Sequence, residues 1–177
     1  MGERIAEGSG MRLRRAQRRD LNACHEIETI CFEGHGASLG RIRRRIEAYP
    51  EGFIVAERRE GEGRIVGFVN SGAFACDDIG DECLKDLVGH DPEGPFLVVF
   101  SLVVRPEARG AGIARELLER LVETAIASDK RAVLLSCREH LLGFYGSLGF
   151  VETGVSPLRF GGHEWREMRL ELGGGAK

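Results

Sequence analysis

The chain has 177 residues, of which 42% are hydrophobic and 30% are charged, a balance typical of one globular domain. Its formal net charge of −3 gives no general attraction to nucleic acid or to an anionic membrane surface. No hydrophobic run reaches transmembrane length, and the first residues lack a signal-peptide core. We therefore expect a cytoplasmic protein with neither nucleic-acid nor membrane partners.

The cysteines are odd in number and never spaced C-x-x-C, which argues against both a disulfide framework and a zinc site. We expect no metal, and we interpret them as small buried or half-buried thiols. They are Cys24, Cys31, Cys76, Cys83 and Cys137.

The N-terminal part begins with a strand and two capped helices. Residues Met11–Gln17 predict the strand. Asp20 is the expected cap of a helix that reaches about Cys31, and Ser38 caps a second helix that Pro50 ends.

A hairpin and a long insertion follow. Phe53–Ala56 and Ile65–Val69 are hydrophobic runs around the polar turn Gly61–Gly63, which predicts two antiparallel strands. Asp78–Pro95 is an acidic insertion with one expected helical turn near Cys83–Val88, and we interpret it as a candidate mobile lid or substrate loop.

The C-terminal half alternates strands and helices. Phe96–Val104 is hydrophobic at every position but Ser101, as expected for a central strand covered on both faces. An amphipathic helix follows, then a short strand at Ala132–Leu135 and a helix closed by Gly149. Trp165–Leu172 alternates as a strand with one buried face. The pattern predicts a mixed α/β fold around a central sheet.

The most informative segment joins the central strand to its helix. It contains the motif Arg109-x-x-Gly112-x-Ala114, a small glycine-rich loop that opens into the helix. Such a junction presents free N–H groups and a positive helix end to an anion, most naturally a phosphate. The motif lacks the Lys-Ser/Thr of nucleotide triphosphatases and is not a full G-x-G-x-x-G. Alone, it is also compatible with a simple chain reversal.

The surrounding sequence resembles the GNAT superfamily of acetyl-CoA-dependent N-acetyltransferases over roughly residues 11–172. The resemblance implies a single mixed central sheet of about six to seven strands flanked by helices. Residues 1–10 and 173–177 are then expected to be mobile ends. Within the superfamily, the chain is most similar to the serotonin (arylalkylamine) N-acetyltransferases and their bacterial relatives. The segments that carry this similarity are Glu26-Ile-Glu28-x-x-x-Phe32, Leu102-Val-Val-x-x-x-x-Arg109, Cys137-Arg-Glu-His-Leu-Leu-Gly-Phe-Tyr145 and Glu167-Met168.

The resemblance also implies a role for individual residues. Tyr145 is expected to protonate the departing CoA thiolate, because a phenol with a pKa near ~10 is neutral at pH 7; its alternative is a core tyrosine. Phe32 and Ser136 match positions near the acceptor amine. The backbone of Leu102, Val103 and Val104 is expected to pair with pantetheine, and the pyrophosphate is expected at Arg109, Gly110, Ala111, Gly112, Ile113, Ala114 and Arg115.

The base that deprotonates the amine is open. Arylalkylamine enzymes place two histidines on the central strand, but the aligned residues here are Val98 and Phe100, so that pair is absent. An enzyme without a dedicated base would take the neutral amine from solution. Other candidates, for each of which a solvated surface role is favoured, are Glu28, His35, His90 and Glu93.

Two arginine-rich segments are interpreted as surface rather than as nucleic-acid sites. Arg12 and Arg14 alternate with hydrophobic residues on an expected edge strand, where charge guards against edge pairing. The second helix presents a solvated basic face, and no aromatic interleaving supports stacking on bases. Its arginines are Arg41, Arg43, Arg44 and Arg45.

The resulting expectation is an acetyl-CoA-dependent N-acetyltransferase, monomeric or homodimeric, acting on a small primary amine without a metal. One alternative is an N-terminal protein or peptide acetyltransferase, although the helix leading to Tyr145 lacks the asparagine common in those enzymes. Another is a GNAT module that binds acyl-CoA without catalysis.

Overall fold

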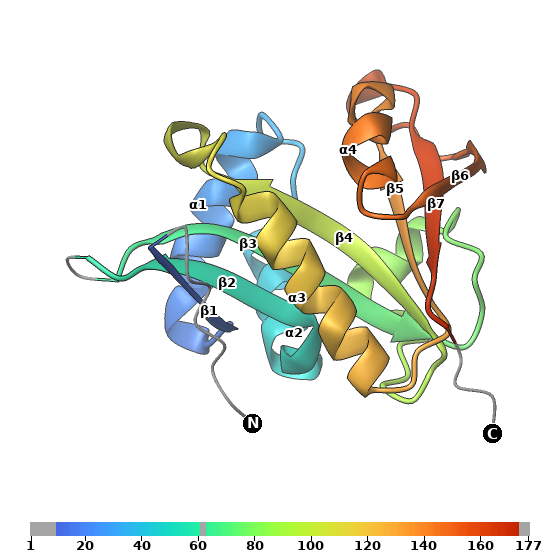
Figure 1. Ribbon diagram of the computed structural model, residues 1–177, viewed down its shortest axis with the longest axis horizontal. Coiled ribbons are helices and arrows are strands. Elements are labelled where there is room, and N and C mark those ends of the chain that lie inside the picture. The colour runs from blue at the N-terminus through green and yellow to red at the C-terminus, as the bar shows by residue number, and fades with distance from the viewer. Residues whose placement is uncertain (1–9, 61–62, 174–177) are drawn as a thin grey trace. The chain divides into compact units, whose positions relative to one another are not determined.

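The computed structural model describes residues 10–60 and 63–173 (Figure 1). Of the two expected mobile ends, all but Gly10 and Gly173 lie outside the described residues, as do the first two residues of the turn Gly61–Gly63. Among the helices that are described, none is long and apolar enough to cross a membrane.

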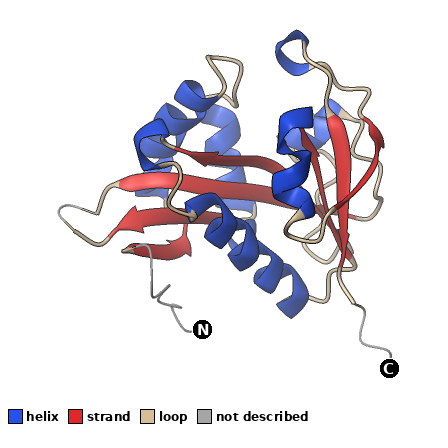
Figure 2. Cartoon of the chain, turned by 45° about the horizontal axis from the view of Figure 1, so that its top comes forward, coloured by secondary structure: helices blue, strands red, loops and turns tan. Residues whose placement is uncertain are grey.

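The strands form one mixed seven-stranded sheet in the order β1-β2-β3-β4-β5-β7-β6, and helices flank it (Figure 2). β4 and β5 pair in parallel, whereas β1 with β2, β2 with β3, β5 with β7 and β6 with β7 pair antiparallel. This confirms the expected fold class. The strands are β1 (Met11–Arg15), β2 (Phe53–Arg58), β3 (Ile65–Phe74), β4 (Phe96–Val104), β5 (Ala132–Cys137), β6 (Val151–Val155) and β7 (Arg166–Glu171). The α-helices are α1 (Leu21–Cys31), α2 (Leu39–Ala48), α3 (Ile113–Ala127) and α4 (Leu142–Gly146).

The chain divides into two compact units. Unit 1 comprises Met1–Asn70 and Ser101–Leu121, and unit 2 comprises Ser71–Phe100 and Val122–Lys177. Unit 1 therefore holds α1, α2, the N-terminal hairpin and the glycine-rich junction, and unit 2 holds the insertion, α4 and the C-terminal strands.

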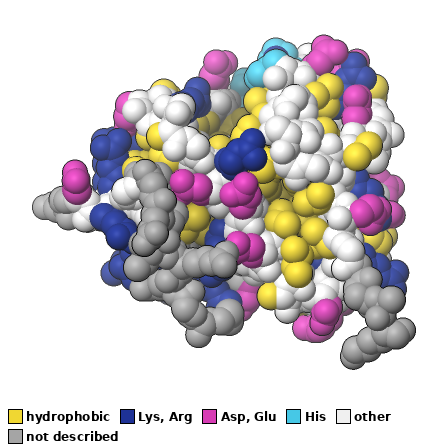
Figure 3. All heavy atoms as spheres, in the orientation of Figure 1, with side chains coloured by type: hydrophobic (Ala, Val, Ile, Leu, Met, Phe, Trp, Pro, Cys, Tyr) yellow, Lys and Arg dark blue, Asp and Glu magenta, His cyan; other side chains and the backbone are white. Residues whose placement is uncertain are grey.

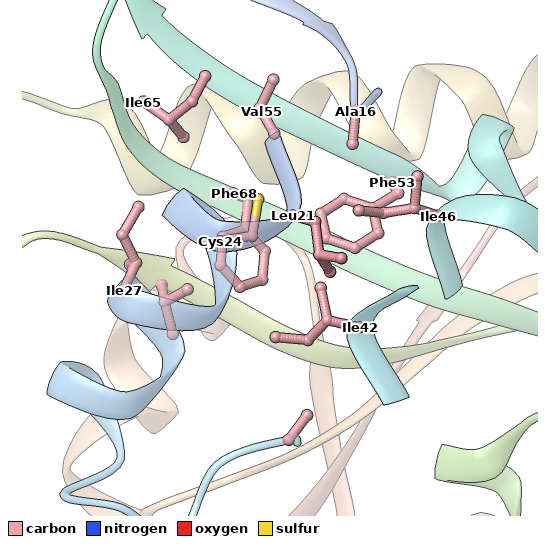
Figure 4. Close-up of a cluster of buried hydrophobic side chains, with 12 residues drawn as sticks. Ala16, Leu21, Cys24, Ile27, Ile42, Ile46, Phe53, Val55, Ile65 and Phe68 are labelled. Atoms are coloured by element: carbon pink, nitrogen blue, oxygen red, sulfur yellow. The ribbon is translucent and has the colours of Figure 1, made fainter. Parts of the chain in front are cut away.

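The core of unit 1 lies between α1, α2 and one face of β2 and β3 (Figure 4). Phe53 and Phe68 are fully buried with their ring centroids 5.3 Å apart. Burial of each large apolar side chain stabilises the fold by roughly 2 kcal/mol relative to exposure. The first turns of α3 cover the opposite face of these strands (Figure 1). Because both faces of these strands are covered by helices, exposed polar groups lie mainly on the loops at the ends of the elements.

The helix starts of unit 1 follow the sequence with one difference. Ser38 precedes α2 and its hydroxyl accepts a hydrogen bond from the Arg41 N–H at 3.3 Å, as predicted. Asp20 directly precedes α1, but its carboxylate accepts from the Gln17 N–H at 2.7 Å and not from α1. A short 3₁₀ turn, Arg18–Asp20, therefore forms the entry to the helix.

Two of the arginines expected on the surface are paired inside unit 1, which corrects the sequence interpretation. On edge strand β1, Arg14 binds Asp20 at 2.7 Å and Glu57 at 3.0 Å, and its side chain is only 7% exposed. On α2, Arg45 is buried and donates to the Asn70 side-chain oxygen at 3.3 Å. The other α2 arginines stay exposed or half-buried. On the face shown in Figure 3, basic and acidic side chains are interspersed.

Unit 2 has its own apolar cluster, in which the insertion packs against the sheet. Leu84 and Leu87 of the insertion lie against a buried group that includes Phe74 and Val98. The Asp91 N–H donates to the Ala73 carbonyl at 2.9 Å, so the insertion is also bonded to β3. The expected helical turn is a 3₁₀ helix, Glu82–Asp86.

Candidate functional site

The glycine-rich junction in unit 1 is an exposed loop between two buried anchors. Val104 at the end of β4 is 6% exposed and Ile113 at the start of α3 is 2% exposed. Between them, Gly110 and Gly112 have φ angles of 83° and 80°, a region that L-residues with a Cβ rarely adopt. A Cβ at either glycine would meet no atom within 4 Å, so these glycines are required by backbone conformation and not by crowding.

The start of α3 supplies donors next to that loop. The first backbone bond of the helix runs from the Glu116 N–H to the Gly112 carbonyl at 3.0 Å. The preceding N–H groups have no partner four residues back within the helix, and the helix dipole is positive at this end. The open space, the glycine conformation and the positive helix end together fit a pyrophosphate group.

A buried arginine fixes the entry to the loop. Arg105 is 5% exposed and donates to both carboxylate oxygens of Glu26 at 3.0 and 3.1 Å, and to the Ile65 carbonyl at 3.1 Å. The hydrogen bonds from Arg105 hold the pKa of Glu26 below its ordinary value. The end of β4 is therefore tied to α1 and β3 through one guanidinium. Sequence reasoning missed this contact, which joins residues far apart in the chain.

Arg109, expected to contact the pyrophosphate, is turned toward α1 and β4. Its Nε donates to the Val104 carbonyl at 3.1 Å, and one Nη lies 3.6 Å from the Cys31 sulfur. Burial raises the pKa of the Cys31 thiol, with Arg109 opposing that shift. Arg109 thus helps to hold the loop as well as lending it positive charge.

The expected acceptor residue Phe32 follows α1 in the same unit and is half-buried. Nearby, Glu28 is only 2% exposed, which corrects the expectation of a solvated surface role. Its Oε1 accepts from the Ser101 hydroxyl at 2.9 Å and from the Ala37 N–H at 3.0 Å. A buried polar residue on an otherwise apolar helix face was the signal that pattern reasoning passed over.

Tyr145 lies on α4 in unit 2 and is 7% exposed. Its ring makes edge contacts with Phe144 and Phe150, at centroid distances of 5.0 and 5.8 Å. Burial, and then the neighbouring Cys137, raise the pKa of the phenol above its ordinary value. The side chain therefore stays protonated across the neutral and moderately alkaline range, as a proton donor must.

Val98 and Phe100, which stand where arylalkylamine enzymes have histidines, contribute to the apolar cluster of unit 2. Val98 is 5% exposed, and the Phe100 ring meets Phe74 edge-on at 6.2 Å. Among the candidate bases in this unit, the His90 Nδ1 lies 3.0 Å from the Ala73 carbonyl, and burial lowers the pKa of the imidazole. Glu93 is exposed, as is His35 in unit 1.

The remaining expected residues divide between the units. Ser136 lies on β5 in unit 2, half-buried and paired with Glu167 of β7. The parallel pairing of β4 with β5 covers four residue pairs, from Phe96–Ala132 to Val99–Leu135. The glycine loop and Phe32 thus belong to unit 1, and Tyr145 and Ser136 belong to unit 2. Over residues 10–60 and 63–173, no group of three or more His, Cys, Asp or Glu side chains is placed to hold a metal ion.

Comparison with known proteins gives a family match over most of the chain. The model described as the acetyltransferase (GNAT) family matches residues 21–150. Glucosamine 6-phosphate N-acetyltransferase 1 of Oryza sativa subsp. japonica is 40% identical over 57 residues, which are 32% of this chain and 34% of the rice protein. The match thus spans about a third of that relative's length.

Solved structures share the fold across nearly the whole chain. The loading GNATL domain of CurA from Lyngbya majuscula superposes with a TM-score of 0.79 at 19% identity, covering 91% of this chain and 97% of that domain. YncA from Salmonella typhimurium, solved with acetyl-CoA, superposes with a TM-score of 0.71 at 21% identity, covering 95% of this chain and 97% of YncA. Naa20 from Chaetomium thermophilum, solved with a bisubstrate analogue, superposes with a TM-score of 0.71 at 25% identity, covering 90% of this chain and 86% of Naa20.

Proposed function

Because this chain belongs to the acetyltransferase (GNAT) family, we propose that it transfers the acetyl group of acetyl-CoA to a small primary amine of the arylalkylamine kind. The observation that carries the proposal is the junction of β4 and α3. Two exposed glycines with positive φ angles directly precede the N-terminus of α3, the positive end of the helix, toward which backbone N–H groups point.

Acetyl-CoA, when bound, supplies an acetyl group already activated as a thioester. The N–H groups from Arg109 to Arg115 bind its pyrophosphate, and the positive end of α3 favours that charge. The backbone of Leu102–Val104 pairs with the pantetheine arm, and N–H groups of β4 polarise the acetyl carbonyl. The positive φ angles of Gly110 and Gly112 support the pyrophosphate site, and the resemblance to the GNAT superfamily implies the roles of β4.

As the amine nitrogen bonds to the acetyl carbon and the C–S bond breaks, Tyr145 donates a proton to the CoA sulfur. The proton that the acetylated nitrogen releases passes to solvent, and solvent restores the phenol of Tyr145. The raised pKa of its buried phenol supports this role, because a neutral phenol donates and a phenolate does not. Phe32 and Ser136 contact the acceptor, Phe32 as an apolar wall.

The chain has no dedicated base in this proposal, and the neutral amine enters from solution. Three observations support it: Val98 and Phe100 pack in an apolar cluster, His90 is bonded to Ala73, and Glu28 already accepts two hydrogen bonds. We therefore expect kcat/KM for the amine to rise with pH toward the amine pKa of about 10. Because the Tyr145 phenol stays protonated, its ionisation should not make kcat/KM fall again below that pH.

A second acceptor class is a peptide N-terminus, since the NatC complex, which shares the fold with a TM-score of 0.75 at 13% identity, was solved with a Gag peptide and CoA. An α-amino group has a pKa near about 8, so its rate would level off about two pH units earlier than that of an alkylamine.

A thiol-release assay with acetyl-CoA, run across pH, tests these proposals together. The panel contains arylalkylamines, N-terminal peptides and glucosamine 6-phosphate. The proposed function requires CoA release with an arylalkylamine and a rate that climbs toward its pKa. Acetyl-CoA binding without release for any amine would instead indicate a non-catalytic module.

A further inference from the structure

Glu28 occupies a position where a hydrophobic side chain would be expected. It lies on the buried face of α1 with Leu21, Cys24 and Ile27, and it is as inaccessible as they are. Burying a carboxylate is costly unless hydrogen bonds replace its water. A residue that breaks the local pattern in this way is often retained for what it holds in place.

The two donors to Glu28 come from different parts of unit 1. Ser101 belongs to β4, one residue before the segment expected to pair with pantetheine, and Ala37 belongs to the loop between α1 and α2. Both bonds reach the same oxygen, and both donors are buried, at 4% and 8% exposure. One carboxylate oxygen therefore connects the α1–α2 loop to the central strand.

The segment Phe32–Ala37, which we name the acceptor loop, is strained and packed onto this side chain. Glu33 has a φ of 51° and Gly34 a φ of 84°, and a non-glycine residue persists there only where its surroundings impose it. A Cβ on Gly36 would lie 2.6 Å from the Glu28 Cγ. The loop backbone thus rests directly on Glu28.

We propose that Glu28 is a positioning residue that anchors the acceptor loop to β4 and thereby sets the KM for the amine. The inference rests on the proposed function, in which Phe32 of this loop contacts the acceptor. Glu28 does not take part in the proton transfer. Its carboxylate holds the loop in the one conformation that presents Phe32.

The test compares Glu28→Met with Glu28→Gln by steady-state kinetics. Methionine suits the apolar face of α1 but accepts neither hydrogen bond, so the amine KM should rise about tenfold, while kcat and the acetyl-CoA KM stay within about twofold. Glutamine still accepts both bonds and should restore most of the wild-type amine KM. Glu57→Met, which removes a carboxylate bound to Arg14 elsewhere in unit 1, is the matched control and should change neither KM.

Two results would overturn the proposal. A loss of kcat in both Glu28 variants would make Glu28 the base, because glutamine cannot accept the proton. An unchanged amine KM in Glu28→Met would remove the positioning role.

If Glu28→Met fails to fold, Gly36→Ala tests the same contact from the loop side, with Gly40→Ala as its control. Gly40 lies on α2, where a Cβ meets no atom within 4 Å. Only Gly36→Ala should raise the amine KM, and equal effects of the two would overturn the proposal.

Hydrogen exchange at the Ala37 amide separates this inference from the proposed function, because it needs no turnover. If the wild-type protein acetylates no amine, the proposed function fails. Faster exchange in Glu28→Met, or in Gly36→Ala if the former does not fold, would still support the anchoring of the loop. Unchanged exchange in the folded variant would refute it.

Discussion

Glu26 and Glu28 lie two residues apart on α1, but their surroundings differ in almost every respect. The Glu26 side chain is 58% exposed and binds the guanidinium of Arg105 with both oxygens. Glu28 is buried and accepts from a hydroxyl and a backbone N–H. The first contact is an ion pair between an exposed carboxylate and a buried guanidinium, and the second is a pair of hydrogen bonds in the core.

The difference shows how one helix serves two loops. Residues two apart on a helix point in different directions, so Glu26 and Glu28 cannot share partners. Glu26 reaches the end of β4 and the entry to the glycine loop, and Glu28 reaches the acceptor loop. If the comparison holds, changes at Glu26 alter the acetyl-CoA KM and changes at Glu28 alter the amine KM.

The largest effect on catalysis is expected at Tyr145. Because Tyr145 belongs to neither loop, its variant should change kcat and neither KM value. Tyr145→Phe removes the proton donor and should lower kcat by about 100-fold, because general acids contribute effects of that order. Both KM values should stay near those of the wild type. Phe144→Leu, which alters a neighbouring ring and leaves the phenol, is the control. An unchanged kcat in Tyr145→Phe would remove the assignment of Tyr145.

Gly112→Ala should weaken acetyl-CoA binding directly, because Gly112 lies in the glycine loop. The new Cβ meets no neighbour, but the φ of 80° strains an alanine, and the loop will leave this conformation. The free-energy cost of placing alanine in this left-handed conformation corresponds to about a tenfold rise in the acetyl-CoA KM. Calorimetric titration with CoA gives the affinity, and the amine KM should not change. If the amine KM rose equally, the two loops would not be independent.

The sequence predicts those elements whose cause is local. The bounds of β4 were expected at Phe96–Val104 and are found there, because an unbroken apolar run specifies a central strand. The glycine loop was likewise predictable, since only glycine favours its backbone conformation. In contrast, β6 was not expected, because its residues are mostly exposed and it contains Gly154. α4 ends at Gly146, earlier than the hydrophobic spacing suggested.

The anchors of the two loops were not predictable for a different reason. Arg105 and Glu26 are 79 residues apart, and Ser101 and Glu28 are 73 apart. A single sequence shows such residues as charged or polar, and therefore as exposed. The spacing of Glu28 from Leu21, Cys24 and Ile27 was a local hint of its burial, but its partners and the burial of Arg45 are revealed only by the fold.

Glu26→Gln tests the contrast between the two glutamates through a smaller effect, a rise in the acetyl-CoA KM. The variant keeps the shape of the side chain and one hydrogen-bond acceptor for Arg105 but removes the charge of Glu26, which solvent screens because that side chain is 58% exposed. We expect the acetyl-CoA KM to rise about threefold at low salt, and less at high salt, with the amine KM unchanged. Steady-state kinetics at two salt concentrations measure both. A rise in the amine KM alone would reverse the roles assigned to the two glutamates.

Asp20→Asn should have the smallest effect on catalysis, because Asp20 precedes α1 and contacts neither loop. Burial alone would raise the pKa of Asp20, but hydrogen bonds from Arg14 and the Gln17 N–H outweigh it and hold the pKa below its ordinary value. A carboxyl group with a lowered pKa stabilises the fold above its unfolded pKa of about 4 and loses that contribution as pH falls through its folded pKa. At pH 7 the variant should therefore melt several degrees below the wild type with both KM values intact, and the gap should close in acid. Thermal unfolding between pH 7 and pH 3 measures this, and a constant gap would show that the charge of Asp20 is not what stabilises the start of α1.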